Sequence, residues 1–306
     1  STDQAMNLAI GADLRDIRSL MSGANSGNPV DWAQVSNLYT AGKNQVQPDG
    51  MLRSLASIAA EDYLAFPNAA GVYGSPAFID AIIRDAIAGS GRSAGLSDNS
   101  RRQIIDKTIQ TIMYGRSLQG LSVARDRFSG ANGLIDEAWA TLAGVRDLSG
   151  TPNNGLLATG LGREEDFMLQ GRLSRPLESS LYRALTSIEL GDRESFTRAV
   201  DASRDYINTI MYLSTLRYAK VLEADMRTAD RETHLAEAWA FFQSIRAQVA
   251  AASPAAADTV ESAYSRSAEE PFTGELTTQV YAAMNQPAVL EALGIPDEFQ
   301  FKSPSR

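Results

Sequence analysis

The sequence contains no cysteine and only one histidine, His234, among its 306 residues. Without cysteine the chain cannot form disulfides, iron–sulfur clusters or zinc–thiolate sites, and it has no thiol nucleophile. A serine–histidine–aspartate triad would have to use His234, because no other histidine is present. The chain also lacks a Gly-x-x-x-x-Gly-Lys-Ser/Thr phosphate loop and a strand-bound dinucleotide motif. These absences predict a protein that is not an enzyme.

Basic residues and long apolar runs are also scarce. The 28 lysines and arginines are outnumbered by 37 acidic residues, which gives a net charge of -9. Nucleic-acid binding needs a basic surface, so this balance argues against a nucleic-acid partner and is compatible with a cation ligand. No run of about 18 apolar residues is present, so we expect no transmembrane segment. The small polar start, Ser1–Gln4, is compatible with a removed signal peptide or with an artificial start.

Apolar residues at helical spacing are abundant. Ile105 and Ile109 belong to one such stripe in the segment 98–128, and the segment 194–226 shows the same pattern. Residues 149–162 contain several glycines and are expected to form a loop. No run shows sustained alternation of apolar and polar residues, so we expect no strands and an all-α fold.

A helical hairpin that begins at a methionine and ends at a tryptophan recurs in the chain. Thr111–Tyr114 followed by Glu137–Ala140 matches Thr209–Tyr212 followed by Glu237–Ala240. A fainter N-terminal copy ends at Trp32, so each of the three tryptophans closes one copy. Recurrence of this kind indicates related structural units, so we expect three related helical hairpins.

The repeat is larger than the hairpin. We expect one domain over residues 1–306, built as a duplicated helical bundle with two pseudo-symmetric halves at about 1–107 and 108–205. The third hairpin and further helices would fill residues 206–306. Halves of this kind often enclose a cleft at their junction, and we expect a ligand there.

Two acidic clusters occupy matching places in the two halves, Glu61-Asp62 in the first and Glu164-Glu165-Asp166 in the second. Carboxylate oxygens bind hard cations such as ferric iron or calcium, which makes Glu61 and Glu165 candidate metal ligands. The alternative interpretation is that both clusters are solvated helix ends.

Tyr114 and Tyr212 match each other in the middle of the two long helices. A phenolate oxygen is a hard ligand that suits ferric iron, so both tyrosines are candidate ligands. The alternative is that both are core residues with a hydrogen-bonded hydroxyl.

His234 and Glu237 lie three residues apart and therefore on one helix face, which makes them candidates for half of a metal site. Di-iron carboxylate bundles need a Glu-x-x-His pair twice, and the first copy has no histidine, so we do not expect a symmetric di-iron site. The alternative is a surface histidine near the start of a helix.

Arg84 and Arg183 also recur in the two halves. An arginine fork can hold a carbonate or a carboxylate, so both are candidate anion-binding residues. Recurrence through packing alone remains the alternative.

Several of these segments together carry a family resemblance. Trp32–Ala60, the stretch Leu38–Asn44 within it, Glu237–Phe242 and the helices with Tyr114 and Tyr212 resemble the algal iron-assimilation proteins. That family is also described as high-CO2-inducible periplasmic proteins, and its domain occurs in phytotransferrins. The resemblance implies extracytoplasmic ferric-iron binding with carbonate as a synergistic anion. It further implies tyrosine and carboxylate ligands, an arginine for the anion and a histidine.

A second resemblance is to the imelysin-like periplasmic iron-regulated proteins, which are duplicated helical bundles. Their Gly-x-His-x-x-Glu motif is met here only at His234 and Glu237. We therefore expect a periplasmic or secreted protein that binds ferric iron for iron acquisition, with a metal ion and a small anion as its ligands. The alternatives are an imelysin-like protein and a metal-free helical-repeat module that binds another protein.

Overall fold

The computed structural model describes residues 2–47, 49–144 and 155–301, with the side chains of residues 2–8 and 10 outside this description. The described residues form helices and no strand, which confirms the expected all-α fold. Their one β-type feature is an isolated bridge between Val46 and Leu52. None of the described helices combines the length and the apolar composition that crossing a membrane requires.

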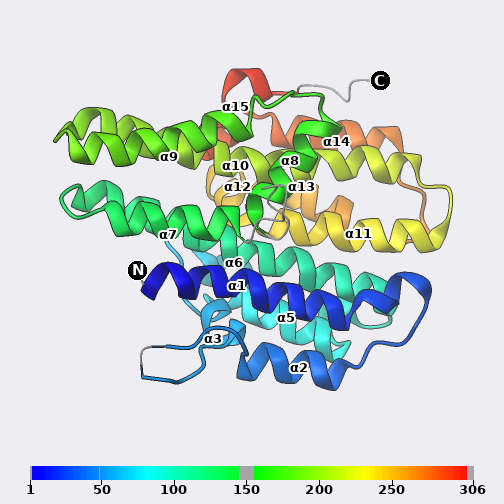
Figure 1. The fold of residues 1–306 in the computed structure, drawn as a ribbon. Coiled ribbons are helices and arrows are strands. Elements are labelled where there is room, and N and C mark those ends of the chain that lie inside the picture. The colour runs from blue at the N-terminus through cyan, green and yellow to red at the C-terminus, as the bar shows by residue number, and fades with distance from the viewer. Residues whose placement is uncertain (1, 48, 145–154, 302–306) are drawn as a thin grey trace.

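The helices lie side by side, with the N-terminal ones on one side of the molecule and the C-terminal ones on the other (Figure 1). The first group is α1 (Thr2–Leu20), η1 (Ser22–Ser26), α2 (Trp32–Ala41), α3 (Leu55–Ala59), α4 (Ala69–Tyr73), α5 (Phe78–Ala88), η2 (Gly91–Ser93), α6 (Asp98–Arg127) and α7 (Asn132–Ala143). The second group is α8 (Leu156–Asp166), α9 (Ser174–Glu189), α10 (Arg193–Ala224), α11 (Thr228–Gln243), α12 (Arg246–Ala252), α13 (Pro254–Tyr264), α14 (Gly274–Met284), α15 (Pro287–Leu293) and η3 (Asp297–Phe299).

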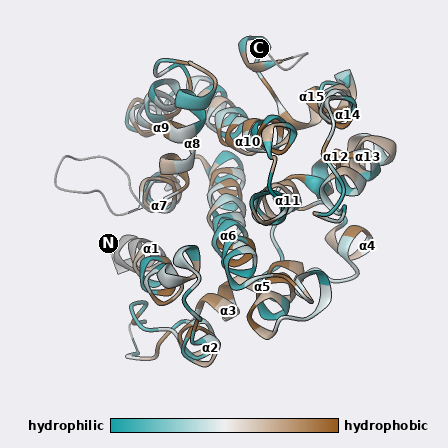
Figure 2. Cartoon of the chain, turned by 90° about the vertical axis from the view of Figure 1, so that its right-hand side faces the viewer, coloured by the Kyte–Doolittle hydropathy of each residue, from teal (hydrophilic) through white to brown (hydrophobic). Residues whose placement is uncertain are grey.

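Helix α6 runs through the centre of the molecule and is surrounded by α1, α5, α7, α10 and α11 (Figure 2). It begins after Ser97, whose side chain accepts a hydrogen bond from the backbone N–H of Ser100 and so caps the helix. Because neighbours cover it on several sides, α6 buries polar residues as well as its isoleucines. The buried polar residues of α6 lead to the candidate site.

Each of the three tryptophan-closed hairpins forms a pair of helices in contact: α1 with α2, α6 with α7, and α10 with α11. The pairs differ in detail, because Trp32 is the first residue of α2 whereas Trp139 and Trp239 lie inside α7 and α11. The pseudo-symmetry of the two halves and the domain boundaries stay predictions. One connected apolar core includes residues from Leu14 to Phe299.

The expectation of a loop over residues 149–162 is wrong for its described C-terminal part. Helix α8 begins at Leu156, and the glycines do not prevent it because Leu156 and Leu157 are buried against the core. A Cβ atom at Gly160 would lie 3.1 Å from Ile210 Cδ1, so glycine here permits close approach of α8 to α10. Tertiary packing therefore outweighs the low helix propensity of glycine in this segment.

Candidate functional site

Tyr114 projects from α6 into the core and is completely buried. Its hydroxyl lies 2.8 Å from Asn208 Oδ1 on α10 and 2.8 Å from Gln248 Oε1 on α12, and its single hydrogen is donated to one of these amide oxygens at a time. Burial raises the pKa of Tyr114 above its ordinary value, so the phenol stays neutral at neutral pH. The described surroundings of Tyr114 are those of a packed core tyrosine with a satisfied hydroxyl.

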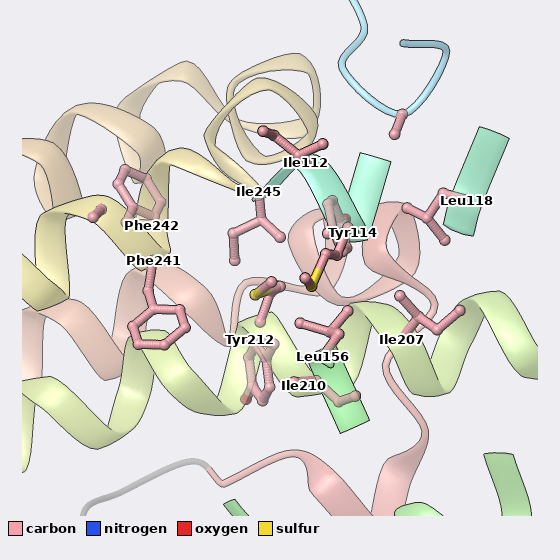
Figure 3. Packing of buried hydrophobic residues seen from close by; sticks show 14 of the residues in the cluster. Ile112, Tyr114, Leu118, Leu156, Ile207, Ile210, Tyr212, Phe241, Phe242 and Ile245 are labelled. Carbon is pink, nitrogen blue, oxygen red and sulfur yellow. The ribbon is translucent and has the colours of Figure 1, made fainter. Parts of the chain in front are cut away.

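Tyr212 on α10 is also completely buried, but its hydroxyl donates to a different amide, Asn285 Oδ1, at 3.0 Å. Burial raises its pKa too. Figure 3 shows both tyrosine rings among aliphatic side chains such as Ile207 and Ile210. The structure thus gives the two matched tyrosines separate partners, and no hydrogen bond in the described chain joins either of them to the acidic clusters.

The two acidic clusters also have different surroundings. Glu61 forms ion pairs with Arg53 and with Arg116, whose Nη1 lies 3.5 Å from Glu61 Oε2. Glu165 is exposed on α8. Both surroundings resemble the solvated helix ends of the alternative interpretation more than a pair of metal ligands.

The buried member of the second cluster is Glu164, which the sequence analysis did not select. Its carboxylate accepts the backbone N–H groups of Leu173 at 2.8 Å and Ser174 at 2.6 Å, and the Ser174 hydroxyl at 3.1 Å. These groups open α9, so Glu164 caps that helix from the preceding one. Its oxygens are used by this cap.

His234 and Glu237 lie on α11 as expected, and each already has a charged neighbour. His234 Nδ1 lies 2.8 Å from Asp225 Oδ2. Glu237 Oε1 lies 3.3 Å from the Nζ of Lys107 on α6. In the neutral tautomer with the hydrogen on Nδ1, this N–H donates to Asp225 and the other ring nitrogen of His234 keeps its lone pair.

Glu237 belongs to a partly buried group of charges that we call the charged layer, in which Arg163 and Glu237 are buried and Asp166 reaches the surface. It lies where α6, α8, α10 and α11 pack against one another. Its members are Lys107, Arg163, Asp166, Arg217, Tyr218 and Glu237.

Ion pairs connect the members of the charged layer. Asp166 Oδ2 forms ion pairs with both arginines, at 3.0 Å from Arg163 Nη2 and 2.8 Å from Arg217 Nε. Lys107 pairs with Glu237 and also with its own neighbour Asp106, at 2.9 Å. Burial opposes ionisation of Lys107, but the two carboxylates outweigh it and raise the pKa of the ammonium group.

Arg163 is the member with the least complete hydrogen bonding, although Arg217 Nε is also buried without a hydrogen-bond partner. Its residue exposure is 8%, and its Nε and Nη1 atoms are buried without a hydrogen-bond partner. Of the described side chains, it alone has two such nitrogen atoms. An unpaired buried donor costs about 1–3 kcal/mol, more when the group is charged, so open donors here point to an acceptor that joins the site.

Tyr218 lies beside these charges with only 4% exposure. Burial raises its pKa to about 12 with a further contribution from Glu237, while Lys107, Arg217 and Arg163 act in the opposite direction. The Arg217 guanidinium lies 4.8 Å from the centre of the Tyr218 ring. The His234 ring centre lies 6.2 Å from it. A phenol, a carboxylate, an imidazole and two guanidinium groups are therefore gathered at one place.

The charged layer has more cations than anions. Lys107, Arg163 and Arg217 carry positive charge, against the carboxylates of Asp166 and Glu237. Asp106 does not remove the excess, because it also binds Arg18 on α1. A small anion would balance the charge and accept the open N–H groups of Arg163.

The two predicted anion-binding arginines have unlike surroundings. Arg84 on α5 forms an ion pair with Asp80, Nε to Oδ2, at 2.8 Å. Arg183 on α9 is exposed and lines a surface pocket of about 580 Å³. They lie on different helices and share no described contact, so they do not form one site.

Sequence reasoning missed Lys107, Arg163 and Tyr218. A signal existed for Lys107, which lies with Asp106 directly inside the apolar stripe of α6, where charged residues are buried. Arg163 and Tyr218 carry no comparable signal in the sequence. Their role depends on the packing of α8 and α10 against α11.

One serine lies in a glycine-flanked turn between α5 and α6. Gly91–Gly95 has the Gly-x-Ser-x-Gly spacing of a hydrolase nucleophile turn. Its serine, Ser93, is 1% exposed in the turn η2 between α5 and α6, with no strand before it. A nucleophile turn needs an exposed serine between a strand and a helix, so this segment does not form one.

Comparison with known proteins gives no assignment. No protein-family model matches the chain, and neither the curated proteins nor the solved structures contain a significant match. Among the described residues, no group of three or more histidine, aspartate and glutamate side chains forms a metal site by itself. The case for a function therefore rests on the charged layer.

Proposed function

We propose that the protein binds ferric iron together with a small oxyanion such as carbonate in the charged layer, as a binding protein outside the cytoplasm. The observation that carries this proposal is the pair of open, buried N–H groups on Arg163, next to Tyr218 and Glu237. Phenolate and carboxylate oxygens are hard ligands that suit ferric iron. The proposed site does not include Tyr114 and Tyr212, because their hydroxyls already have amide partners.

The anion would be held by the arginines. Arg163 offers N–H groups that the protein leaves open, and Arg217 lies over the neighbouring Tyr218 ring. An oxyanion at this position would offset part of the positive charge of the arginines and the iron, and would place further oxygen atoms beside the tyrosine. These arginines take the role that the sequence suggested for Arg84 and Arg183.

The metal would be held by Tyr218 and Glu237, with His234 as a third donor. Asp225 fixes the His234 ring through Nδ1, which leaves the other ring nitrogen free to bind. Tyr218 has a pKa of about 12, so its proton must leave when the oxygen binds iron. Iron binding should therefore release a proton and strengthen as the pH rises.

The test is spectroscopic. Metal-free protein is titrated with ferric nitrilotriacetate in the presence and absence of bicarbonate, and the visible tyrosinate-to-iron absorption band is recorded. We expect the wild-type band to need bicarbonate. We expect Tyr218→Phe to abolish it and Glu237→Gln to weaken iron binding about 10-fold or more.

Matched controls decide where the site lies. Tyr114→Phe and Tyr212→Phe remove equally buried phenols outside the charged layer, and both variants should keep the band. Arg163→Gln should weaken or lose the band even when bicarbonate is present, because the anion loses the N–H groups that would hold it. A wild-type protein without the band, or a band that persists in Tyr218→Phe, would rule out the proposed site.

A further inference from the structure

Helices α9 and α10 lie side by side (Figure 1), and a second group of arginines lines a surface pocket between them. It lines the pocket of about 580 Å³ that contains Arg183, and its polar side chains include Arg172, Arg175 and Tyr206. None of these residues belongs to the charged layer. We call this feature the arginine pocket, and its volume lies in the range of small-molecule sites, about 300–1,000 Å³.

The arginines of this pocket lack the partners that neutralise comparable arginines elsewhere. Arg175 and Arg183 form no ion pair with a described residue, and Arg172 donates its Nε to the carbonyl oxygen of Leu169 at 3.0 Å. By contrast, Arg84 pairs with Asp80. In a chain with a net charge of -9, three arginines without carboxylate partners around one pocket are a local reversal of charge.

The pocket is shaped by its backbone as well as by charge. Gly171 has a φ angle of 81°, and a Cβ atom there would lie 2.8 Å from Arg175 Nε. The glycine therefore lets the Arg175 side chain lie directly against the main chain. On the other wall, the Tyr206 ring packs edge-on against Phe299, with ring centres 6.3 Å apart. The Tyr206 ring is thus packed in place before any ligand binds.

Charged side chains of both signs lie near Tyr206. Burial raises the pKa of Tyr206, and the carboxylates of Glu298 and Asp205 raise it further, whereas Arg183 lowers it. The backbone N–H groups of Leu173 and Ser174 are not available to the pocket, because Glu164 already accepts them. The charged groups that line the pocket are the arginine side chains.

We infer that the arginine pocket binds a small polyanion, a molecule that carries two or more phosphate or carboxylate groups. One guanidinium pairs well with one phosphate or carboxylate group, so several arginines around one cavity suit several such groups. A single monovalent anion would leave most of this positive charge unpaired. This inference does not depend on iron binding, because it uses different residues and a different ligand.

Calorimetry on the full, iron-free chain tests it with two probes, inorganic pyrophosphate and citrate. We expect saturable binding of at least one probe at low salt, weakening as the salt concentration rises. Binding of pyrophosphate alone identifies a phosphate ligand, and binding of citrate alone identifies a carboxylate ligand. Binding of both shows that the pocket recognises charge and not the type of group, which also supports the inference.

Variants locate the binding. Arg175→Ala and Arg183→Ala should each weaken it about 10-fold or more, the usual effect of losing a charged hydrogen-bonding partner. Arg84→Ala is the matched control, since it removes an exposed arginine that Asp80 already pairs, and Arg163→Gln controls for binding in the charged layer. Absence of heat with both probes would refute the inference. Equal losses in Arg183→Ala and Arg84→Ala would refute it as well.

Discussion

Two regions along α6 and α10 place polar groups in the same core. One region contains Tyr114 and Tyr212, and the other is the charged layer. The tyrosine hydroxyls are neutral, and each meets an amide oxygen at 2.8–3.0 Å. The charged layer contains ionised groups, more cations than anions, and open donors on Arg163. Chemically suitable ligand atoms are present in both regions, yet only one of them has hydrogen bonds left to make.

The difference shows how a buried polar group can be judged. A hydroxyl with its partner inside the protein gains little from a ligand, because the ligand must first break that bond. A buried guanidinium with open N–H groups has lost its hydrogen bonds to water without replacing them. A ligand that accepts these N–H groups would recover part of the lost free energy. The residue type alone, on which Tyr114 and Tyr212 were selected, does not separate the two situations.

The largest expected effect comes from breaking the charged layer at Lys107. Lys107→Met removes the cation beside Asp106 and Glu237, whose side chains are only 7% and 9% exposed. Because buried carboxylates then lack their partner, the free energy of unfolding should fall by about 3 kcal/mol or more. Urea denaturation at neutral pH measures this change.

A double variant separates lost attraction from lost packing. Lys107→Met combined with Glu237→Gln removes both charges of that pair, and should recover part of the stability that the single variant loses. If the double variant is less stable than Lys107→Met by the full effect of Glu237→Gln alone, the two side chains are not coupled.

The next largest effect is a pH dependence of the free energy of unfolding, which should be weaker in Tyr218→Phe than in the wild type. Its pKa is about 12 in the folded chain, against about 10 for an ordinary tyrosine, so the unfolded chain loses the proton first. Between pH 10 and pH 12 the unfolded state binds fewer protons, and stability therefore falls as the pH rises. Tyr218→Phe should remove roughly 2–3 kcal/mol of that fall.

Urea denaturation of wild type and Tyr218→Phe at pH 9, 10 and 11 measures the slopes. Other buried tyrosines also ionise late, so the comparison between the two proteins isolates Tyr218. Identical slopes in both proteins would mean that Tyr218 ionises at the ordinary pH of an exposed tyrosine.

The helices were largely predictable, because the spacing of isoleucines such as Ile105 and Ile109 reports the buried face directly. The expected long helix over 98–128 corresponds to α6, and the one over 194–226 to α10. The start of α8 was not predictable, since glycine usually interrupts a helix and only contact with α10 explains its place at Gly160.

The candidate site was less predictable. His234 and Glu237 were found because their spacing on one helix is local information. Glu164 and Glu165 are neighbours in sequence, but a turn of about 100° per residue buries one and exposes the other. Which of them faces inward depends on packing that no local pattern contains.

The smallest effect compares the two core tyrosines with each other. Tyr114→Phe leaves Asn208 Oδ1 without that donor, and Asn208 is 7% exposed, so water cannot easily replace the hydroxyl. Its loss should cost about 1–3 kcal/mol. Tyr212→Phe should cost about 0.5–1.5 kcal/mol, because its partner Asn285 is half-buried and accessible to water. Urea denaturation of both variants gives the order, and the reverse order would show that burial of the partner does not set the cost. Both hydroxyls lie outside the charged layer, so these losses of stability should be unrelated to iron binding. We therefore expect Tyr114 and Tyr212 to affect stability and Tyr218 to affect ligand binding.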